Sequence, residues 1–208
     1  LYNTHCLWKN QGIPRIAWQI YKKGEKEVSD LLRKVQLTEY EMLKEIDRIA
    51  KKHNIKYYLG CGTLLGAVKY KKFIPWDDDI DLLIEYKELK KLIKVFKEEA
   101  DPKYIITNCF IEKHFPVAWS KVRNTETLSR PVRYKELPIN WGICIDIFPL
   151  CPLHDNKLLH NLKINLSYLT EVLLRAETAK YTKSSSFKLK MIEKLPYKFR
   201  RFLASIFI

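Results

Sequence analysis

Residues 77–81 concentrate negative charge in a basic chain. Asp77, Asp78, Asp79 and Asp81 fall within five positions of a protein whose formal net charge is +14. Carboxylates this close repel one another and raise each other's pKa. If residues 80–85 form a strand, alternation places Asp79 and Asp81 on one face, and the intervening apolar side chains on the other. Two such carboxylates suit a hard divalent cation, Mg²⁺ or Mn²⁺, which would offset their repulsion.

A solvated acidic turn is the alternative interpretation of this cluster. Such a turn usually stops after one or two acids, whereas here the acids run directly into the apolar residues 82–84. We therefore favour the metal-binding interpretation, in which Asp77 and Asp78 lie in the preceding loop. Asp78 also has the opposite strand parity to Asp79 and Asp81.

Asp146 is a second unusual acid, because it interrupts the β-rich run of residues 142–148 (GICIDIF). Burial of an unpaired carboxylate is costly, so this residue needs a partner. One possibility is an ion pair with an Arg or Lys of the core. The other is that Asp146 is the third carboxylate of the metal site formed by Asp79 and Asp81.

Two further features suit an anionic substrate. The segment Gly60-Cys61-Gly62-Thr63 ends a strand and opens a helix, an arrangement that offers backbone N–H groups to a phosphate. Lys121 and Arg123 alternate along a predicted strand and would neutralise phosphate oxygens. Together with the acids, these residues predict metal-assisted transfer of a substituted phosphate from a nucleotide donor. A carboxylate that the metal does not saturate would accept the proton of the attacking hydroxyl.

The elements that must position these residues alternate between helix and strand. We predict an α/β (α+β) fold with a mixed sheet flanked by helices. Its catalytic core covers residues 28–151, between an irregular lead-in at 1–27 and a helical basic segment at 152–208. The expected helices are 30–52, 63–68, 86–99, 156–179 and one or two within 186–207, and the expected strands are 55–59, 80–85, 104–107, 117–123 and 142–148.

Composition limits the classes of partner and compartment. The excess of Lys and Arg predicts an anionic partner. Five scattered cysteines without a CxxC pair argue against a disulfide framework and favour a reducing, cytoplasmic location. No run of 18 apolar residues predicts a transmembrane helix. The basic segment 180–201 either approaches the anionic inner face of a membrane or forms a solvated helical face.

At this point the sequence resembles a known family. Residues 57–69 (YYLGCGTLLGAVK), 73–81 (FIPWDDDID), 121–125 (KVRNT) and 145–150 (IDIFPL) are similar to the LicD family, over about residues 30–150. That family includes bacterial phosphocholine transferases, and fukutin is similar. The resemblance implies a nucleotidyltransferase-like fold and transfer of phosphocholine or phosphoribitol from a CDP-linked donor to a sugar hydroxyl.

The resemblance also assigns roles to individual residues. It makes Gly62 and Thr63 the glycine-containing donor-binding element, Asp79 and Asp81 the paired metal ligands, and Asp146 the third acid. The implied acceptor is a glycan or lipid-linked saccharide of the cell surface, such as lipopolysaccharide or teichoic acid. Cys61, Lys69 and Cys151 depart from the family pattern. The family continues beyond the length of this chain, so we expect a fragment that lacks a C-terminal segment.

Two other functional classes compete with this one. A nucleotidyltransferase acting on nucleic acid would fit the net charge, but the interleaved basic and aromatic residues that bind single strands are not evident near the acids. Nucleic acid is therefore not the favoured partner. A catalytically degenerate binding or scaffold member of the family is disfavoured because all three acids are present.

Overall fold

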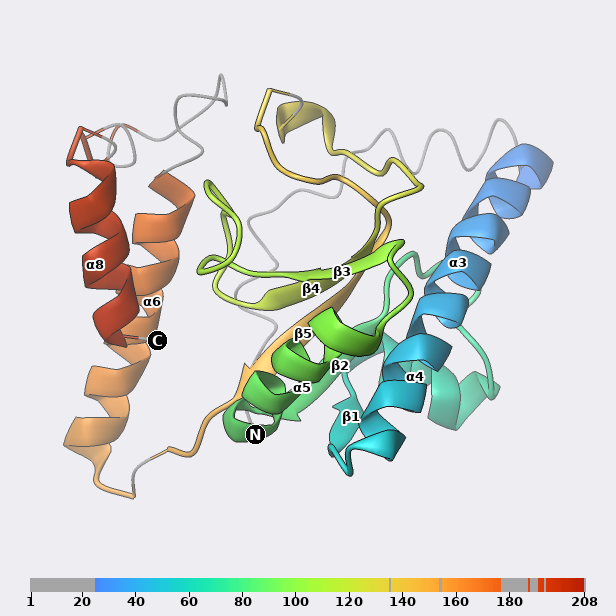
Figure 1. The fold of residues 1–208 in the computed structure, drawn as a ribbon, viewed down its shortest axis with the longest axis horizontal. Coiled ribbons are helices and arrows are strands. Elements are labelled where there is room, and N and C mark those ends of the chain that lie inside the picture. The colour runs from blue at the N-terminus through green and yellow to red at the C-terminus, as the bar shows by residue number, and fades with distance from the viewer. Residues whose placement is uncertain are drawn as a thin grey trace.

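The computed structural model describes residues 25–134, 136–153, 155–176, 187, 191–192 and 194–207 (Figure 1). The helices of this part are α3 (Glu25–Lys52), α4 (Cys61–Leu65), the π-helix η1 (Gly66–Tyr70), α5 (Tyr86–Glu99), the 3₁₀ turn η2 (Val132–Tyr134), α6 (Lys157–Ala176) and α8 (Tyr197–Phe207). The strands are β1 (Tyr57–Leu59), β2 (Asp81–Glu85), β3 (Tyr104–Thr107), β4 (Ser120–Asn124) and β5 (Cys144–Leu150).

The strands form one mixed sheet in the order β1-β2-β5-β4-β3. Strands β2 and β5 at its centre are parallel, and the other three pairs are antiparallel. A parallel pair needs a long crossover connection, and here α5, β3 and β4 lie between β2 and β5 in the chain. The parallel pair is important for the site because both strands begin at the same end of the sheet, so that their first residues lie close together.

Helices α3 and α5 pack against one face of this sheet (Figure 1). The alternating apolar residues of β2 and β5 point into the main core, where they meet the buried stripe of α3 and that of α5. These core residues include Met42, Ile46 and Ile49 of α3, Leu89, Leu92 and Phe96 of α5, Leu82, Ile84, Ile145 and Ile147 of the central strands, and Ile80 just before β2. The side chains between them in β2 and β5 therefore face the opposite side.

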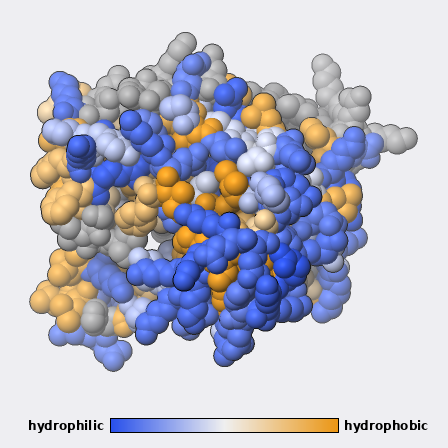
Figure 2. Space-filling model, in the orientation of Figure 1, coloured by the Kyte–Doolittle hydropathy of each residue, from blue (hydrophilic) through white to orange (hydrophobic). Residues whose placement is uncertain are grey.

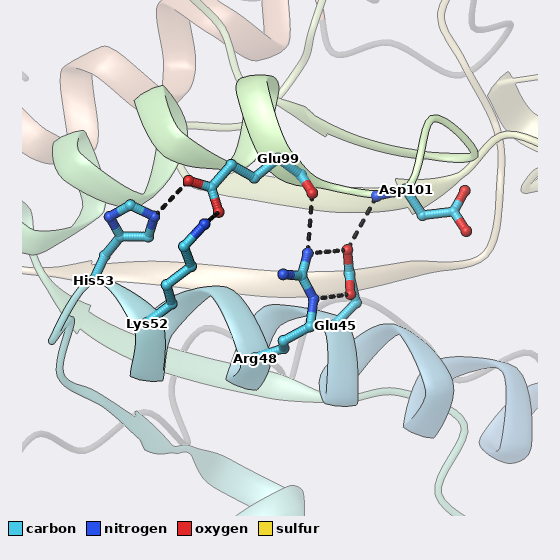
Figure 3. A network of polar contacts seen from close by, with 6 residues as sticks. All are labelled: Glu45, Arg48, Lys52, His53, Glu99 and Asp101. Atoms are coloured by element: carbon cyan, nitrogen blue, oxygen red, sulfur yellow. Dashed lines mark hydrogen bonds and ion pairs between the residues drawn. The ribbon is translucent and has the colours of Figure 1, made fainter.

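A polar network also joins the C-terminal part of α3 to the end of α5 (Figure 3). Arg48 binds both carboxylate oxygens of Glu45 at 2.8 Å and donates to the Glu99 carbonyl at 3.0 Å. The Glu99 carboxylate in turn meets Lys52 at 2.9 Å and His53 at 2.8 Å. Because these pairs are close to solvent, each adds little stability, but together they fix how α3 crosses α5.

Helices α6 and α8 lie side by side and form a second, smaller core (Figure 1). Leu173 and Leu174 of α6 and Ala204 of α8 pack with Cys109 and Phe115 from the connection between β3 and β4. Among the helices that the structure describes, none combines the length and the apolar composition that a membrane-spanning segment requires.

The predicted fold class is confirmed, with several corrected element boundaries. Strand β2 begins only at Asp81, so Asp79 precedes it. Strand β4 begins at Ser120, which pairs with Ile147 of β5, and not at residue 117. Helix α4 begins at Cys61, earlier than predicted, and continues as a π-helix. The predicted lead-in lies mostly outside the described residues, and of the predicted helices within 186–207 the structure describes Tyr197–Phe207.

Candidate active site

Strand pairing brings two of the predicted acids together. Asp81 of β2 and Asp146 of β5 are direct partners in the parallel pair, and the Asp146 N–H donates to the Ile80 carbonyl at 3.0 Å. On the other side of β5, Lys121 of β4 is the partner of Asp146. Paired residues of adjacent strands share a face, so a carboxylate, a second carboxylate and an ammonium form a row across the sheet.

Both carboxylate oxygens of Asp146 have partners within the protein. Trp119 donates its indole N–H to Oδ2 at 2.9 Å, and the Lys121 ammonium contacts Oδ1. Burial opposes the charge on Lys121, but the neighbouring Cys144 and Asp146 raise its pKa overall. The ion pair considered as one alternative for Asp146 is therefore present. A metal at Asp146 would share this carboxylate with Lys121, and the metal role of Asp146 stays a prediction.

The segment Gly60-Cys61-Gly62-Thr63 supports the acids directly. Thr63 Oγ1 accepts the N–H of Asp81 at 2.9 Å, and Gly60 donates its N–H to the Asp81 carbonyl at 2.8 Å. A Cβ at Gly62 would lie 2.4 Å from Asp77 Oδ2, so the glycine lets that carboxylate approach. The observed contacts of Gly62 and Thr63 hold the acids in place, and their predicted role in donor binding remains untested.

Residues 77–79 converge just before β2. Among the described residues, the carboxylate oxygens of Asp77, Asp78 and Asp79 come within 4.8 Å of one another. Strand alternation predicts that Asp78 faces away from Asp79, but this segment precedes the strand, so alternation does not apply to it. The side-chain amide of Gln36, on α3, donates to the Asp77 carbonyl at 2.8 Å and fixes the loop against the helix.

Burial and mutual repulsion make Asp79 and Asp81 hard to ionise together. Burial, followed by the charges of Asp81, Asp77 and Asp78, raises the pKa of Asp79 to about 7. Burial and the nearby Asp146 likewise raise the pKa of Asp81. The donor set consists of carboxylates alone, which is the chemistry that Mg²⁺ and Mn²⁺ prefer. The residues present therefore fit the predicted cation.

Glu39 of α3 is a site residue that the sequence analysis missed. It is only 2% exposed, and its Oε2 has no hydrogen-bond partner in the described structure. Burial, followed by the charges of Asp79 and Asp78, raises its pKa to about 9. The sequence pattern could have indicated this residue, because Glu39 occupies a position on the buried stripe of α3 where an apolar residue is expected.

A cavity of about 330 Å³ lies between α3 and the sheet, and Asp77 and Asp81 are not in its lining. Its polar lining includes Glu39, Asp78, Asp79, Lys121 and Asp146, whereas Leu31, Leu32 and Val35 of α3 form an apolar wall. The cavity therefore joins a strongly acidic end to an apolar side.

Arg123 lies on the same face as Lys121, one pleat further along β4. It is 2% exposed, and its guanidinium carbon lies 5.8 Å from the Phe115 ring centre and 5.5 Å from that of Trp141. Its Nε has no hydrogen-bond partner in the described structure. Contact with a donor phosphate, predicted for both Lys121 and Arg123, stays a prediction.

Asp81 and Asp146 lie on adjoining strands of a mixed sheet, and carboxylates placed in this way could bind a divalent cation. The model of the LicD/FKTN/FKRP nucleotidyltransferase domain family matches residues 54–195, which is more than half of the chain. The chain therefore belongs to the LicD family, as the sequence motifs predict.

Individual relatives match over shorter stretches. Lipopolysaccharide cholinephosphotransferase LicD of Haemophilus influenzae is 38% identical over 73 residues, which cover 35% of this chain and 28% of the relative. An uncharacterized protein of Rickettsia prowazekii is 33% identical over 86 residues, covering 39% of this chain and 32% of the relative. The matched stretches thus span about a third of these relatives' length. No solved structure matches the chain.

The backbone at Cys61 yields a stability prediction. Cys61 has φ of 42°, a left-handed conformation that favours glycine, and its thiol hydrogen-bonds Asp81. Both Cys61→Gly and Cys61→Ala lose the thiol contact, but only glycine relieves the backbone. We expect Cys61→Gly to be more stable than Cys61→Ala by about 1 kcal/mol in urea unfolding. Equal stability of the two variants would contradict the strain at this residue.

Glu39 yields a prediction on pH dependence. Its folded pKa of about 9 lies above the ordinary value of 4.5, so the folded state binds more protons between these values and loses stability as pH rises. In EDTA, Glu39→Gln should therefore stabilise the protein more at pH 8 than at pH 5. The upper limit of this difference is about 1.4 kcal/mol per pH unit. Thermal unfolding at both pH values tests it.

Glu41→Gln is the matched control, because Glu41 is exposed on the same helix and pairs with Lys44 at 2.6 Å. Its effect should not grow with pH. If Glu39→Gln increased the stability of the protein by the same amount at pH 5 and pH 8, Glu39 would ionise normally.

Proposed function

We propose that this chain is a divalent-metal-dependent transferase domain. It moves a substituted phosphate, of the phosphocholine or phosphoribitol type, from a CDP-linked donor to a hydroxyl of a cell-surface glycan. The observation that carries the proposal is the pairing of Asp81 with Asp146 where β2 and β5 begin, with the charge of Asp79 close to both. Membership of the LicD family and the similarity to a lipopolysaccharide cholinephosphotransferase support the reaction class.

The acidic residues would bind the cation, and the residues around them would hold them in position. Asp79 and Asp81 would hold Mg²⁺ or Mn²⁺, which supplies charge neutralisation for the donor phosphates and the leaving nucleotide when bound. Thr63 fixes the backbone of Asp81 through a hydrogen bond, so that this carboxylate is positioned before the cation arrives. Lys121 and Trp119 hold Asp146 in one orientation.

The remaining residues suit the donor and the acceptor. Lys121 is the cation that the described structure places in the cavity lining, and it would contact the donor phosphates there. A carboxylate of the 77–79 loop that the cation leaves free would accept the acceptor's hydroxyl proton. The half-buried Leu32 and Val35 of α3 shield one side of the cavity from water, which strengthens these electrostatic interactions. The donor would be a cytidine diphosphate derivative and the acceptor a glycan or lipid-linked saccharide.

The test of this function is turnover of a panel of CDP-linked donors with Mg²⁺. We expect CMP release with CDP-choline or CDP-ribitol when a glycan acceptor is present. Asp79→Asn should lower the rate at least about 100-fold, because the several kcal/mol that a bound cation contributes would be lost. Asp155→Asn, at an exposed acid outside the site, is the control and should keep the wild-type rate. Absence of turnover with every cytidine donor would count against the proposal.

We also propose that the helical basic segment contacts the anionic inner face of a membrane, where a lipid-linked acceptor would be reached. Hydrophobic side chains are exposed on α6 and α8, at the left edge of the surface in Figure 2. They include Leu158, 78% exposed, Leu162, 51% exposed, and Phe202, 62% exposed. Lys157, Lys163 and Lys198 accompany them on the same two helices. Apolar and basic side chains together suit an anionic bilayer surface.

Vesicle sedimentation tests this contact. The protein should bind phosphatidylglycerol-containing vesicles, bind phosphatidylcholine vesicles weakly, and dissociate at high salt. The pair Leu158→Ser with Leu162→Ser removes apolar surface without changing charge and should weaken binding several-fold. Leu37→Ser, at a residue of α3 that is 45% exposed, should not weaken it. If the wild type, the double variant and Leu37→Ser bound equally, the exposed side of α6 and α8 would be a solvated helical face and not a membrane contact.

A further inference from the structure

Glu39 is the buried acid that the proposed mechanism leaves without a role. Its side chain is almost fully enclosed, and Oε2 has no hydrogen-bond partner within the described residues. An unpaired carboxylate in such a place is costly. By contrast, Glu41 and Glu45 on the same helix pair with Lys44 and Arg48.

The charged groups around Glu39 do not compensate for it. It lines the cavity with Asp78, Asp79 and Asp146, all of the same sign. Lys121 is the cation that the described structure places in the cavity lining, and its ammonium contacts Asp146. The side chains of Leu32 and Val35, one turn or more earlier in α3, are apolar. Nothing in the described surroundings therefore stabilises a negative charge on Glu39.

The position of Glu39 relative to the acid loop is fixed by its own helix. Gln36, about one turn before Glu39, donates its side-chain amide to the carbonyls of Asp77 at 2.8 Å and Ile74 at 3.3 Å. Residues three apart on a helix share a face, so Glu39 faces the same loop. Glu39 thus lines, from the α3 side, the same cavity as Asp78 and Asp79.

From this geometry we propose that Glu39 is a further carboxylate of the cation site. It would bind the same divalent ion as Asp79 from the opposite, α3 side of the cavity, directly or through a water that the ion holds. A cation between α3 and the acid loop is the partner that Glu39 lacks, and a carboxylate is a ligand that Mg²⁺ and Mn²⁺ favour. This inference rests on the metal dependence in the proposed function, and it adds a ligand from outside the DDDID segment.

The test is Mn²⁺ affinity, measured on the full chain by titration calorimetry and by the electron paramagnetic resonance signal of free Mn²⁺. Glu39→Gln should weaken Mn²⁺ binding about 10- to 100-fold, the range found when groups around a metal are removed. Glu41→Gln should bind as the wild type does. Glu39→Met, which keeps the length of the side chain without an oxygen ligand, should weaken binding to a similar extent.

The outcomes separate this inference from the proposed function. One outcome is that the wild type binds Mn²⁺ and Asp79→Asn does not, while either Glu39 variant binds Mn²⁺ as tightly as the wild type. Glu39 is then not part of the site, although the metal dependence stands. If the wild type itself binds no Mn²⁺, the metal dependence fails and the inference fails with it. Weakened binding in both Glu39 variants, with folding intact by circular dichroism, supports the inference.

Discussion

The crowding of carboxylates in a space partly shielded from water is the constraint around which the neighbouring elements are arranged. Asp77, Asp78 and Asp79 approach one another before β2, and the register of the central strands sets Asp81 beside Asp146. The surrounding anchors fix these groups in place mostly through neutral hydrogen bonds, from Thr63, Gln36 and Trp119. Such bonds orient the acids without cancelling their charge. Only Lys121, among the described contacts of these acids, brings a full positive charge, and it does so for Asp146. The site is thus held together while most of its negative charge is retained for a cation.

Helix α3 links the stability of the domain to the site. Its C-terminal half supplies core residues and is tied to α5 by the network around Arg48 and Glu99 (Figure 3). Its N-terminal half extends past the core, where it walls the cavity and holds the acid loop through Gln36. The position of Glu39 between these halves is therefore set by packing that lies some turns away. The favourable packing of the helix offsets the cost of burying one acid.

Much of this arrangement was readable from the sequence because it depends on local periodicity. The strand parity of Asp81, the β-rich run around Asp146 and the helix over residues 86–99 follow from alternation and helical period, and the structure confirms these elements. What could not be read were tertiary relations. The ion pair of Asp146 with Lys121 depends on which strand lies next to β5, and the clustering of Asp78 with Asp79 depends on where β2 begins. Glu39 was overlooked because helical period marks a buried position but does not say which site that position faces.

The direct pairing of Asp81 with Asp146 also sets which changes in chain length the domain can tolerate. The two strands are joined through a long connection that contains α5, β3 and β4, and insertions in its loops leave the pairing intact. A single residue inserted within β2 or β5 would instead exchange the two faces of that strand beyond the insertion. In β5, for example, a residue inserted between Cys144 and Asp146 would turn Asp146 toward the apolar core and Ile147 toward the opposite face. Divergent members of such a fold can therefore differ widely in loop length, while their central strands must keep the same spacing.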